Sequence, residues 1–130
     1  MADIVLALKS KWLELILSGK KTAEARRVLP KKLNPGDKVF LYCRRFLHGH
    51  AYVKKVLRTG NDCVDYGLYS LSIHWSGDRA LSHETLKELE DYMSKAKPSR
   101  CGYIILQNAT RYDDPHPWRG STPQNFIYYK

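Results

Sequence analysis

The sequence predicts an α+β domain built as a small mixed β-barrel of five or six strands with two main flanking helices. The segments of strand and helix character do not alternate in the β-α order of a doubly wound parallel sheet, which excludes that fold. Closing so many short strands into a barrel removes the exposed edges that an open sheet would present. A length of 130 residues suits one domain, which we take as residues 1–130.

The beginning of the chain predicts a strand, a helix and a second strand. Residues 4–8 are apolar and β-prone, and Ser10 is expected to cap a helix over residues 11–18 that Gly19 ends. Polar and small side chains alternate over residues 21–27, as in a strand with one polar face. The apolar side chains of the helix recur at one-turn spacing, which predicts a core stripe, and not base-stacking platforms, for Trp12, Leu13, Ile16 and Leu17.

The remainder predicts further strands around a second helix. Ser82 can cap a helix that runs to about Ala96 and that Pro98 stops. Residues 58–79 contain many turn residues and are expected to form mainly loops. Apolar runs that are typical of strands lie at residues 38–43, 50–57, 101–107 and 126–129.

The net charge of +9 is the first indication of function. Lys and Arg total 22 against 13 acidic residues, and the pI is near 9.5. Such a surplus on a small domain attracts polyanions, and a cluster of cations can follow a phosphate backbone. A solvated basic surface without a ligand is the alternative. The basic residues gather in two regions of the sequence: Lys9, Lys11, Lys20, Lys21, Arg26, Arg27, Lys31 and Lys32, then Arg44, Arg45, Lys54 and Lys55.

Cysteine usage and hydropathy indicate a cytoplasmic protein. Cys43, Cys63 and Cys101 are odd in number and none belongs to a CxxC pair, unlike a secreted disulfide framework. Cys43 and Cys101 lie in apolar strand-like runs, so buried reduced thiols are expected. No apolar run approaches the roughly twenty residues of a membrane span, and the N-terminus lacks the basic region of a signal peptide.

The segment SGKKTAEARR at residues 18–27 carries the main candidate site. A turn after the helix leads at once into a strand that brings Lys21, Glu24 and Arg26 close together. Glu24 can hold both cations in fixed orientations, and an arginine held in this way can grip a phosphate or a base edge with two hydrogen bonds. A surface strand with scattered salt bridges is the alternative reading of this segment.

These residues form the pattern GxKxxExR, from Gly19 to Arg26, and with it the chain resembles the ASCH domain family of the PUA-like superfamily. The resemblance extends over nearly the whole chain, since the opening strand and helix, the PGDKV turn at residues 35–39, the Gly49-x-Ala51 strand and the PQNF segment at 123–126 are also similar. It implies a PUA-like β-barrel with flanking helices. It also implies a cleft lined by the signature residues that binds RNA or a modified nucleoside.

The resemblance supports an enzyme as the second hypothesis, with Lys21 and Glu24 as catalytic residues. One ASCH branch resembles an amidohydrolase acting on acetylated cytidine through Lys, Thr and Glu. Lys21 matches its lysine, but Glu24 stands at its threonine position. Other members have been proposed as ribonucleases, for which cations can stabilise the developing charge and a carboxylate can act as base. A domain that docks an acidic protein is a third reading.

Residues outside the signature complete the predicted ligand surface. Arg27, Arg44 and Arg45 are expected to form a basic rim, and Trp75 and Trp118, in polar loop-like contexts, are candidates for stacking on bases. The expected partner is RNA or a nucleotide, with DNA as an alternative, and the sequence leaves the oligomeric state open.

No cofactor or metal site is predicted. His48-x-His50 could chelate an ion, but no third ligand follows at a persuasive spacing. The sequence also lacks a phosphate-binding loop, a dinucleotide glycine fingerprint and a nucleophile elbow.

Overall fold

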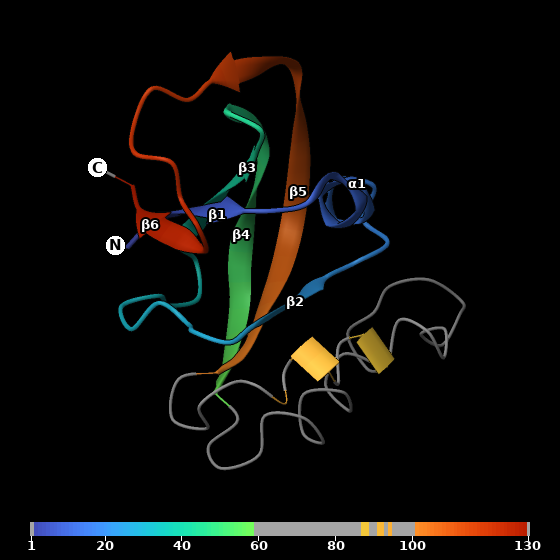
Figure 1. Cartoon of the computed structure of the whole chain (residues 1–130), viewed down its shortest axis with the longest axis vertical. Helices are drawn as coiled ribbons and strands as arrows, with labels where there is room; N and C mark the ends of the chain where they lie inside the picture. Colours follow the sequence, from blue (N-terminus) through green and yellow to red (C-terminus); the bar gives the residue numbers. More distant parts are fainter. Residues whose placement is uncertain (1, 59–86, 89–90, 93, 95–100, 130) are drawn as a thin grey trace.

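The computed structural model describes residues 2–58, 87–88, 91–92, 94 and 101–129 (Figure 1). The described strands form one sheet in the order β2-β5-β4-β3-β1-β6, and helix α1 contacts strands β3 and β5 of this sheet. The elements are β1 Ile4–Ala7, α1 Ser10–Leu17, β2 Ala23–Arg26, β3 Lys38–Cys43, β4 Phe46–Arg58, β5 Gly102–Pro117 and β6 Phe126–Tyr128.

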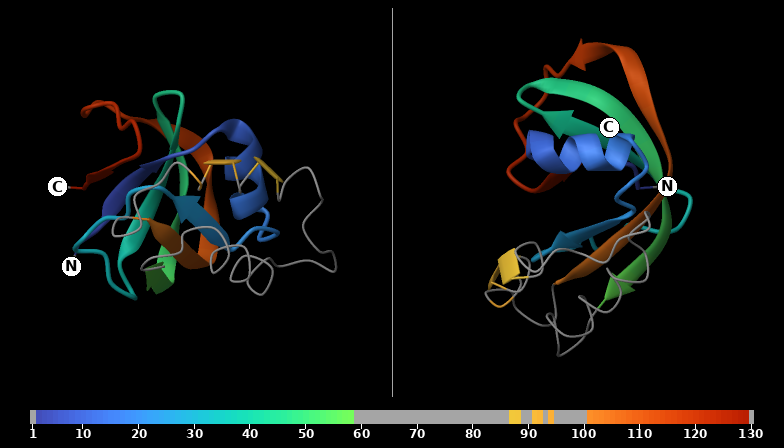
Figure 2. Two further views of the ribbon diagram at one scale, coloured as in Figure 1. Left: turned by 60° about the horizontal axis from the view of Figure 1, so that its bottom comes forward. Right: turned by 90° about the vertical axis from the view of Figure 1, so that its right-hand side faces the viewer.

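The sheet is mixed and strongly curled. β1 pairs in parallel with β3, and the other neighbouring strands pair antiparallel. The pairing of the long strands β4 and β5 shifts register at three places, and such bulges bend and twist a sheet. As a result β4 and β5 curve around α1 (Figure 2). In the part of the chain that the structure describes, the sheet is therefore a half-barrel whose edge strands are β2 and β6.

Strand alternation sorts the apolar side chains onto two faces of the sheet. On the inner face, Ile4 and Leu6 of β1 join the main core cluster with Leu13 and Ile16 of α1. On the outer face, a smaller cluster forms around Val5, Tyr42 and Leu47. Successive residues of a strand point to opposite faces, so a single short strand contributes to both clusters.

The predicted mixed sheet and its strands are confirmed, with β4 and β5 longer than expected. The barrel is present as a half-barrel. The second predicted helix falls mostly outside the described residues, so two flanking helices are not established. Its described residues with helical backbone are Lys87, Glu88, Asp91, Tyr92 and Ser94.

The prediction that Ser10 caps α1 is wrong by one residue. Lys9 occupies the cap position, because its carbonyl oxygen accepts from the N–H groups of Trp12 and Leu13, both at 3.0 Å. No side chain caps this helix start. Gly19 follows the helix with a φ of 78°, the left-handed conformation that glycine adopts without a steric penalty.

The cysteines only partly match the expectation. Cys43 is a buried free thiol, as predicted. Cys101 is also buried but is disulfide-bonded, so the prediction of a reduced thiol is wrong there. Sequence spacing does not show that two distant cysteines meet within bonding distance in the fold. Among the described residues, no helix combines the length and apolar character that crossing a membrane requires.

We expect Gly49→Ala to destabilise the fold. A Cβ atom at Gly49 would overlap the backbone oxygen of Thr110 on β5 and lie 2.7 Å from Cδ2 of Leu17. Overpacking of this kind costs about 1–3 kcal/mol. Urea denaturation should show that loss, whereas Lys54→Ala, an exposed change on the same strand, should leave the unfolding free energy nearly unchanged. Equal stability of the two variants would contradict the close strand approach.

Candidate functional site

The turn after α1 places the signature residues beside the helix. The N–H of Lys21 donates to the carbonyl oxygen of Leu15 at 2.9 Å, which holds the turn against the last part of the helix. The chain then enters β2, where Glu24 lies opposite Ile104 of β5. Lys21 and Glu24 are thereby fixed from two directions, by the helix end and by the sheet.

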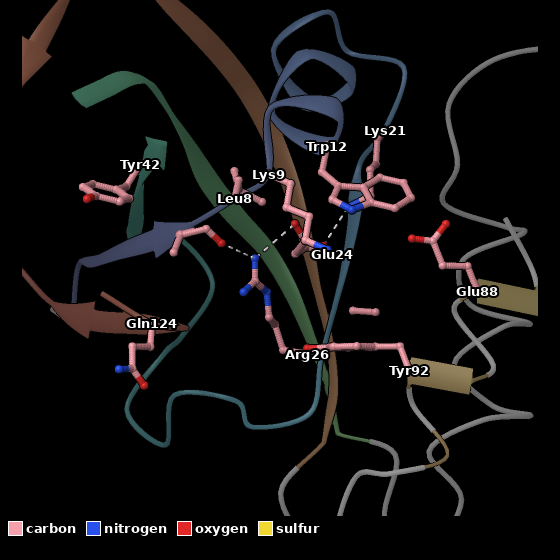
Figure 3. A pocket seen from close by; sticks show the side chains of 12 residues that line it. Leu8, Lys9, Trp12, Lys21, Glu24, Arg26, Tyr42, Glu88, Tyr92 and Gln124 are labelled. Carbon is pink, nitrogen blue, oxygen red and sulfur yellow. Dashed lines mark hydrogen bonds and ion pairs between the residues drawn. The ribbon is translucent and has the colours of Figure 1, made fainter. Parts of the chain in front are cut away.

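Lys21 and Glu24 form a buried ion pair, and they are only 3% and 6% exposed. Nζ of Lys21 lies 2.9 Å from Oε1 of Glu24, and Nη2 of Arg26 lies 3.5 Å from Oε2 (Figure 3). The carboxylate therefore sits between two cations, as the sequence predicted. The three charges sum to one positive charge in a largely buried site.

Arg26 connects three parts of the chain. Its Nη2 donates to the carbonyl oxygen of Ala7, at the end of β1, at 2.7 Å, and its Nη1 donates to Oδ1 of Asn125 at 2.8 Å. Asn125 in turn donates to the carbonyl oxygen of Val28 at 3.0 Å. Nε of Arg26 is the one buried side-chain nitrogen or oxygen of the described residues without a hydrogen-bond partner. The guanidinium is thus fixed in place with one N–H unused.

This network forms part of the wall of a pocket of about 460 Å³. A volume of this size is typical of small-ligand sites. Aromatic rings supply much of the remaining wall, from Trp12 on α1, Tyr42 on β3 and Tyr92 (Figure 3). The pocket is lined by Ala7, Leu8, Lys9, Trp12, Lys21, Glu24, Ala25, Arg26, Tyr42, Glu88, Tyr92 and Gln124.

Burial and charge pairing act in opposite directions on these groups. Burial lowers the pKa of the Lys21 ammonium, and Glu24 only partly offsets this effect. For Glu24, burial alone would raise the pKa of the carboxyl, but the charges and hydrogen bonds of Lys21 and Arg26 outweigh it and hold the pKa below its ordinary range. Glu24 is therefore ionised at neutral pH, which makes it a good hydrogen-bond acceptor and a weak base.

The other predicted site residues lie elsewhere. Arg27 is next to the pocket: its Nε donates to the carbonyl oxygen of Tyr92 at 2.8 Å, and its guanidinium lies 4.0 Å from the centre of that ring. Arg44 and Arg45 form the β3–β4 turn, with φ angles of 50° and 74°, and do not line the pocket. Trp118 packs on the outer face of the sheet instead. Trp75 lies outside the described residues.

Trp12, which the sequence predicts as core, packs against the main core cluster and also lines the pocket, which Tyr42 lines as well. Trp12 is only partly buried, and its ring centre lies 5.3 Å from Nζ of Lys21 and 4.6 Å from Nζ of Lys11. Tyr42 is buried yet reaches the pocket. No local pattern indicated that Trp12 lines the pocket, because Trp12 fits the apolar stripe of the helix and its contact with Lys21 joins two elements.

The histidines are not grouped as metal ligands. His48 is hydrogen-bonded through Nε2 to the carbonyl oxygen of Cys43 at 3.1 Å, and His50 through Nδ1 to the hydroxyl of Tyr112 at 2.9 Å. Within the described ranges, no group of three or more His, Cys, Asp or Glu side chains is placed to hold a metal ion.

We expect Glu24→Gln to lower the free energy of unfolding by about 3–5 kcal/mol at neutral pH, because it leaves the buried Lys21 ammonium without its counter-charge. The difference in unfolding free energy between the parent and Glu24→Gln should become smaller in acid. The pKa of Glu24 is lowered in the folded state, so its contribution is complete above the ordinary glutamate value of about 4.3 and is lost as the pH falls further.

Chemical denaturation at a series of pH values measures this effect. Glu14→Gln is the matched control, since it breaks an exposed pair between Glu14 and Arg111 at 2.6 Å and should change stability little. A Glu24→Gln protein as stable as the Glu14→Gln protein at pH 7 would show that the buried pair contributes no stability.

Known proteins place the chain in a family. The family model of the ASCH domain matches residues 6–126. Crystal structures of an ASCH protein from Zymomonas mobilis, and of its tyrosine-to-phenylalanine and serine-to-alanine variants, superpose on the chain with a TM-score of 0.72 each. Their sequences are 18%, 17% and 18% identical, over 98% of this chain and 87%, 90% and 88% of theirs, so the likeness shows a common fold. No curated protein matches the chain significantly. Because the family model spans most of its sequence, the chain belongs to the ASCH domain family.

Proposed function

We propose that this domain binds RNA or a nucleotide and holds one nucleotide unit in the pocket around Lys21, Glu24 and Arg26. The observation that carries the proposal is a buried, net positive group of three charges in the wall of a pocket of nucleotide size. The ASCH domain has a PUA-like fold that is generally associated with RNA, which supports the same ligand class.

The unused donors of the network favour a ligand that carries oxygen acceptors. Lys21 has three N–H donors, and among the described residues its ammonium is hydrogen-bonded to Glu24. Arg26 keeps one buried N–H without a partner. A phosphate oxygen or a base carbonyl would accept from the remaining N–H groups of Lys21, and such charge-assisted bonds are strong where water is excluded.

The carboxylate and the rings favour a base over a simple anion. Each oxygen of Glu24 retains a lone pair that can accept from an exocyclic amine, 2.9 Å from the donor Nζ of Lys21. Such a pair suits a base edge with an acceptor beside a donor, as in cytosine and guanine. Trp12 and Tyr92 offer ring surface for stacking.

An enzyme at the same pocket is the second candidate function, either a ribonuclease or an amidohydrolase acting on acetylated cytidine. The lowered pKa of Lys21 favours it, because a lysine shifted toward neutrality can transfer a proton. The ionised Glu24 would then orient Lys21 more than act as base. Either function suits the predicted cytoplasmic location, although the disulfide at Cys101 removes reduced thiols as a ground for that prediction.

We expect Lys21→Met to weaken binding of a short single-stranded RNA by about 10- to 150-fold, since a hydrogen bond to a charged group contributes about 1.5–3 kcal/mol. Fluorescence anisotropy at two salt concentrations measures this effect, with circular dichroism to verify folding. Arg111→Gln removes the same charge from an exposed site that does not line the pocket. Arg111→Gln should weaken RNA binding much less than Lys21→Met. Equal losses of affinity in the two variants would refute the pocket as the binding site and would indicate general electrostatic attraction.

A denaturing gel of the same mixtures shows whether the protein cleaves the RNA. A parallel incubation with free acetylated cytidine shows whether the protein removes the acetyl group. Product formation by the parent that disappears in Lys21→Met and in Glu24→Gln, with Glu24→Gln still binding RNA at low temperature, would establish catalysis. Binding without product by the parent would leave the domain as a binding module.

A further inference from the structure

We propose that the outer face of the sheet is a second site, which binds single-stranded nucleic acid by stacking bases on a belt of aromatic rings. The belt consists of the side chains of Trp118, Tyr129, Phe40, His50, Tyr52, Tyr112 and His116. None of them lines the pocket, and the inference does not depend on the pocket's ligand.

Strand register places the rings on one face. Phe40 of β3 lies opposite His50 of β4, and Lys38 lies opposite Tyr52, so these four side chains point the same way. Phe40 also lies beside Val5 of β1, which belongs to the outer cluster. The main core and α1 occupy the opposite face, where Val39 and Leu41 point.

Neighbouring rings of the belt contact one another within two groups that meet at the paired residues Phe40 and His50. Trp118 and Tyr129 have centres 6.1 Å apart, and Tyr129 and Phe40 have centres 4.4 Å apart. Beyond the Phe40–His50 pair, His50 lies 5.5 Å from the ring of Tyr112 and from that of Tyr52. His116 stacks on Tyr112 at 4.3 Å with an interplanar angle of 14°. The rings therefore form two groups, one ending at Phe40 and the other at His50, and the pairing of these two residues places the groups side by side on the same face.

This surface is held in place yet open to solvent. Phe40, Tyr112 and Trp118 pack on the small buried cluster of the outer face, and the hydroxyl of Tyr112 is hydrogen-bonded to His50. Tyr129 remains 43% exposed, and His116 is exposed. Rings fixed from below lose little freedom when a base stacks on them, which favours binding.

Cations border the belt and favour a polyanion as its partner. Nζ of Lys38 lies 5.0 Å from the ring centre of Phe40. The N–H of Trp118 donates to the carbonyl oxygen of Arg45 at 2.8 Å, which brings the exposed Arg44–Arg45 turn to one end of the belt, and Arg119 is also exposed. Asp113 and Asp114 are exposed on β5 and offset part of this charge.

The combination of rings and cations favours single strands. Bases must be unpaired to stack on side chains, whereas a duplex offers such a surface only its phosphates. Arg44, Arg45 and Trp118, which were predicted to bind the ligand but lie outside the pocket, would bind nucleic acid at this face. Because stacking is available to every base, RNA and DNA single strands are both expected to bind.

The experiment compares the parent with the double variant Tyr129→Leu/His116→Gln by fluorescence anisotropy. The labelled ligands are 15-nucleotide single strands of RNA and of DNA, the matching duplex and a nucleoside monophosphate. We expect the double variant to bind both single strands about 10- to 100-fold more weakly, in line with the loss of stacked bases. Its binding of the monophosphate should equal the parent's. Lys21→Met should instead lose the monophosphate, so failure of the pocket and failure of the belt are distinguishable.

Phe46→Leu is the matched control, because Phe46 is 41% exposed but lies opposite Cys43, whose side chain belongs to the inner core. Unchanged single-strand affinity in the double variant would overturn the proposal, and so would an equal loss in Phe46→Leu. Duplex binding as tight as single-strand binding would also overturn it. Sedimentation that reveals a dimer, which the double variant dissociates, would identify the belt as a contact between copies of the chain.

Discussion

The ion pair between Lys21 and Glu24, extended by Arg26, is the interaction on which the rest of the site depends. Two buried charges of opposite sign stabilise each other only in a fixed geometry, and the end of α1 and strand β2 provide that geometry. Arg26 then carries the constraint to the end of β1 and to Asn125. A group that costs free energy to bury is thus also the group that positions the walls of the pocket.

The two faces of the sheet differ in how far they are enclosed. On the inner side, α1 and the curved strands border a pocket whose wall contains the connected charges of Lys21, Glu24 and Arg26. On the outer side, shallow packing leaves rings and cations in contact with solvent. If both act on nucleic acid, the pocket would recognise one unit while the belt holds the strand that carries it. Affinity would then depend on the length of the ligand as well as on its identity.

Much of the fold and the centre of the site followed from local sequence features, because they depend on neighbouring residues. The apolar runs indicated the strands, and the spacing of Lys21, Glu24 and Arg26 along β2 indicated the charged group. Features that depend on contacts across the chain could not be predicted in this way. Trp12 appears as one more apolar residue of a helix until Lys21 is seen beside it, and nothing near Trp118 shows which face it covers.

The partners of Arg26 have a consequence for the order in which the domain is made. Arg26 and Asn125 are separated by 99 positions in the sequence, and β2 pairs with β5 across most of the chain. Contacts of such long range form only after most of the polypeptide has been synthesised and has folded. A nascent or truncated chain can therefore build its first strand and helix without a complete pocket. A chain that lacks β5 or Asn125 therefore lacks contacts that hold β2 and Arg26 in the pocket wall.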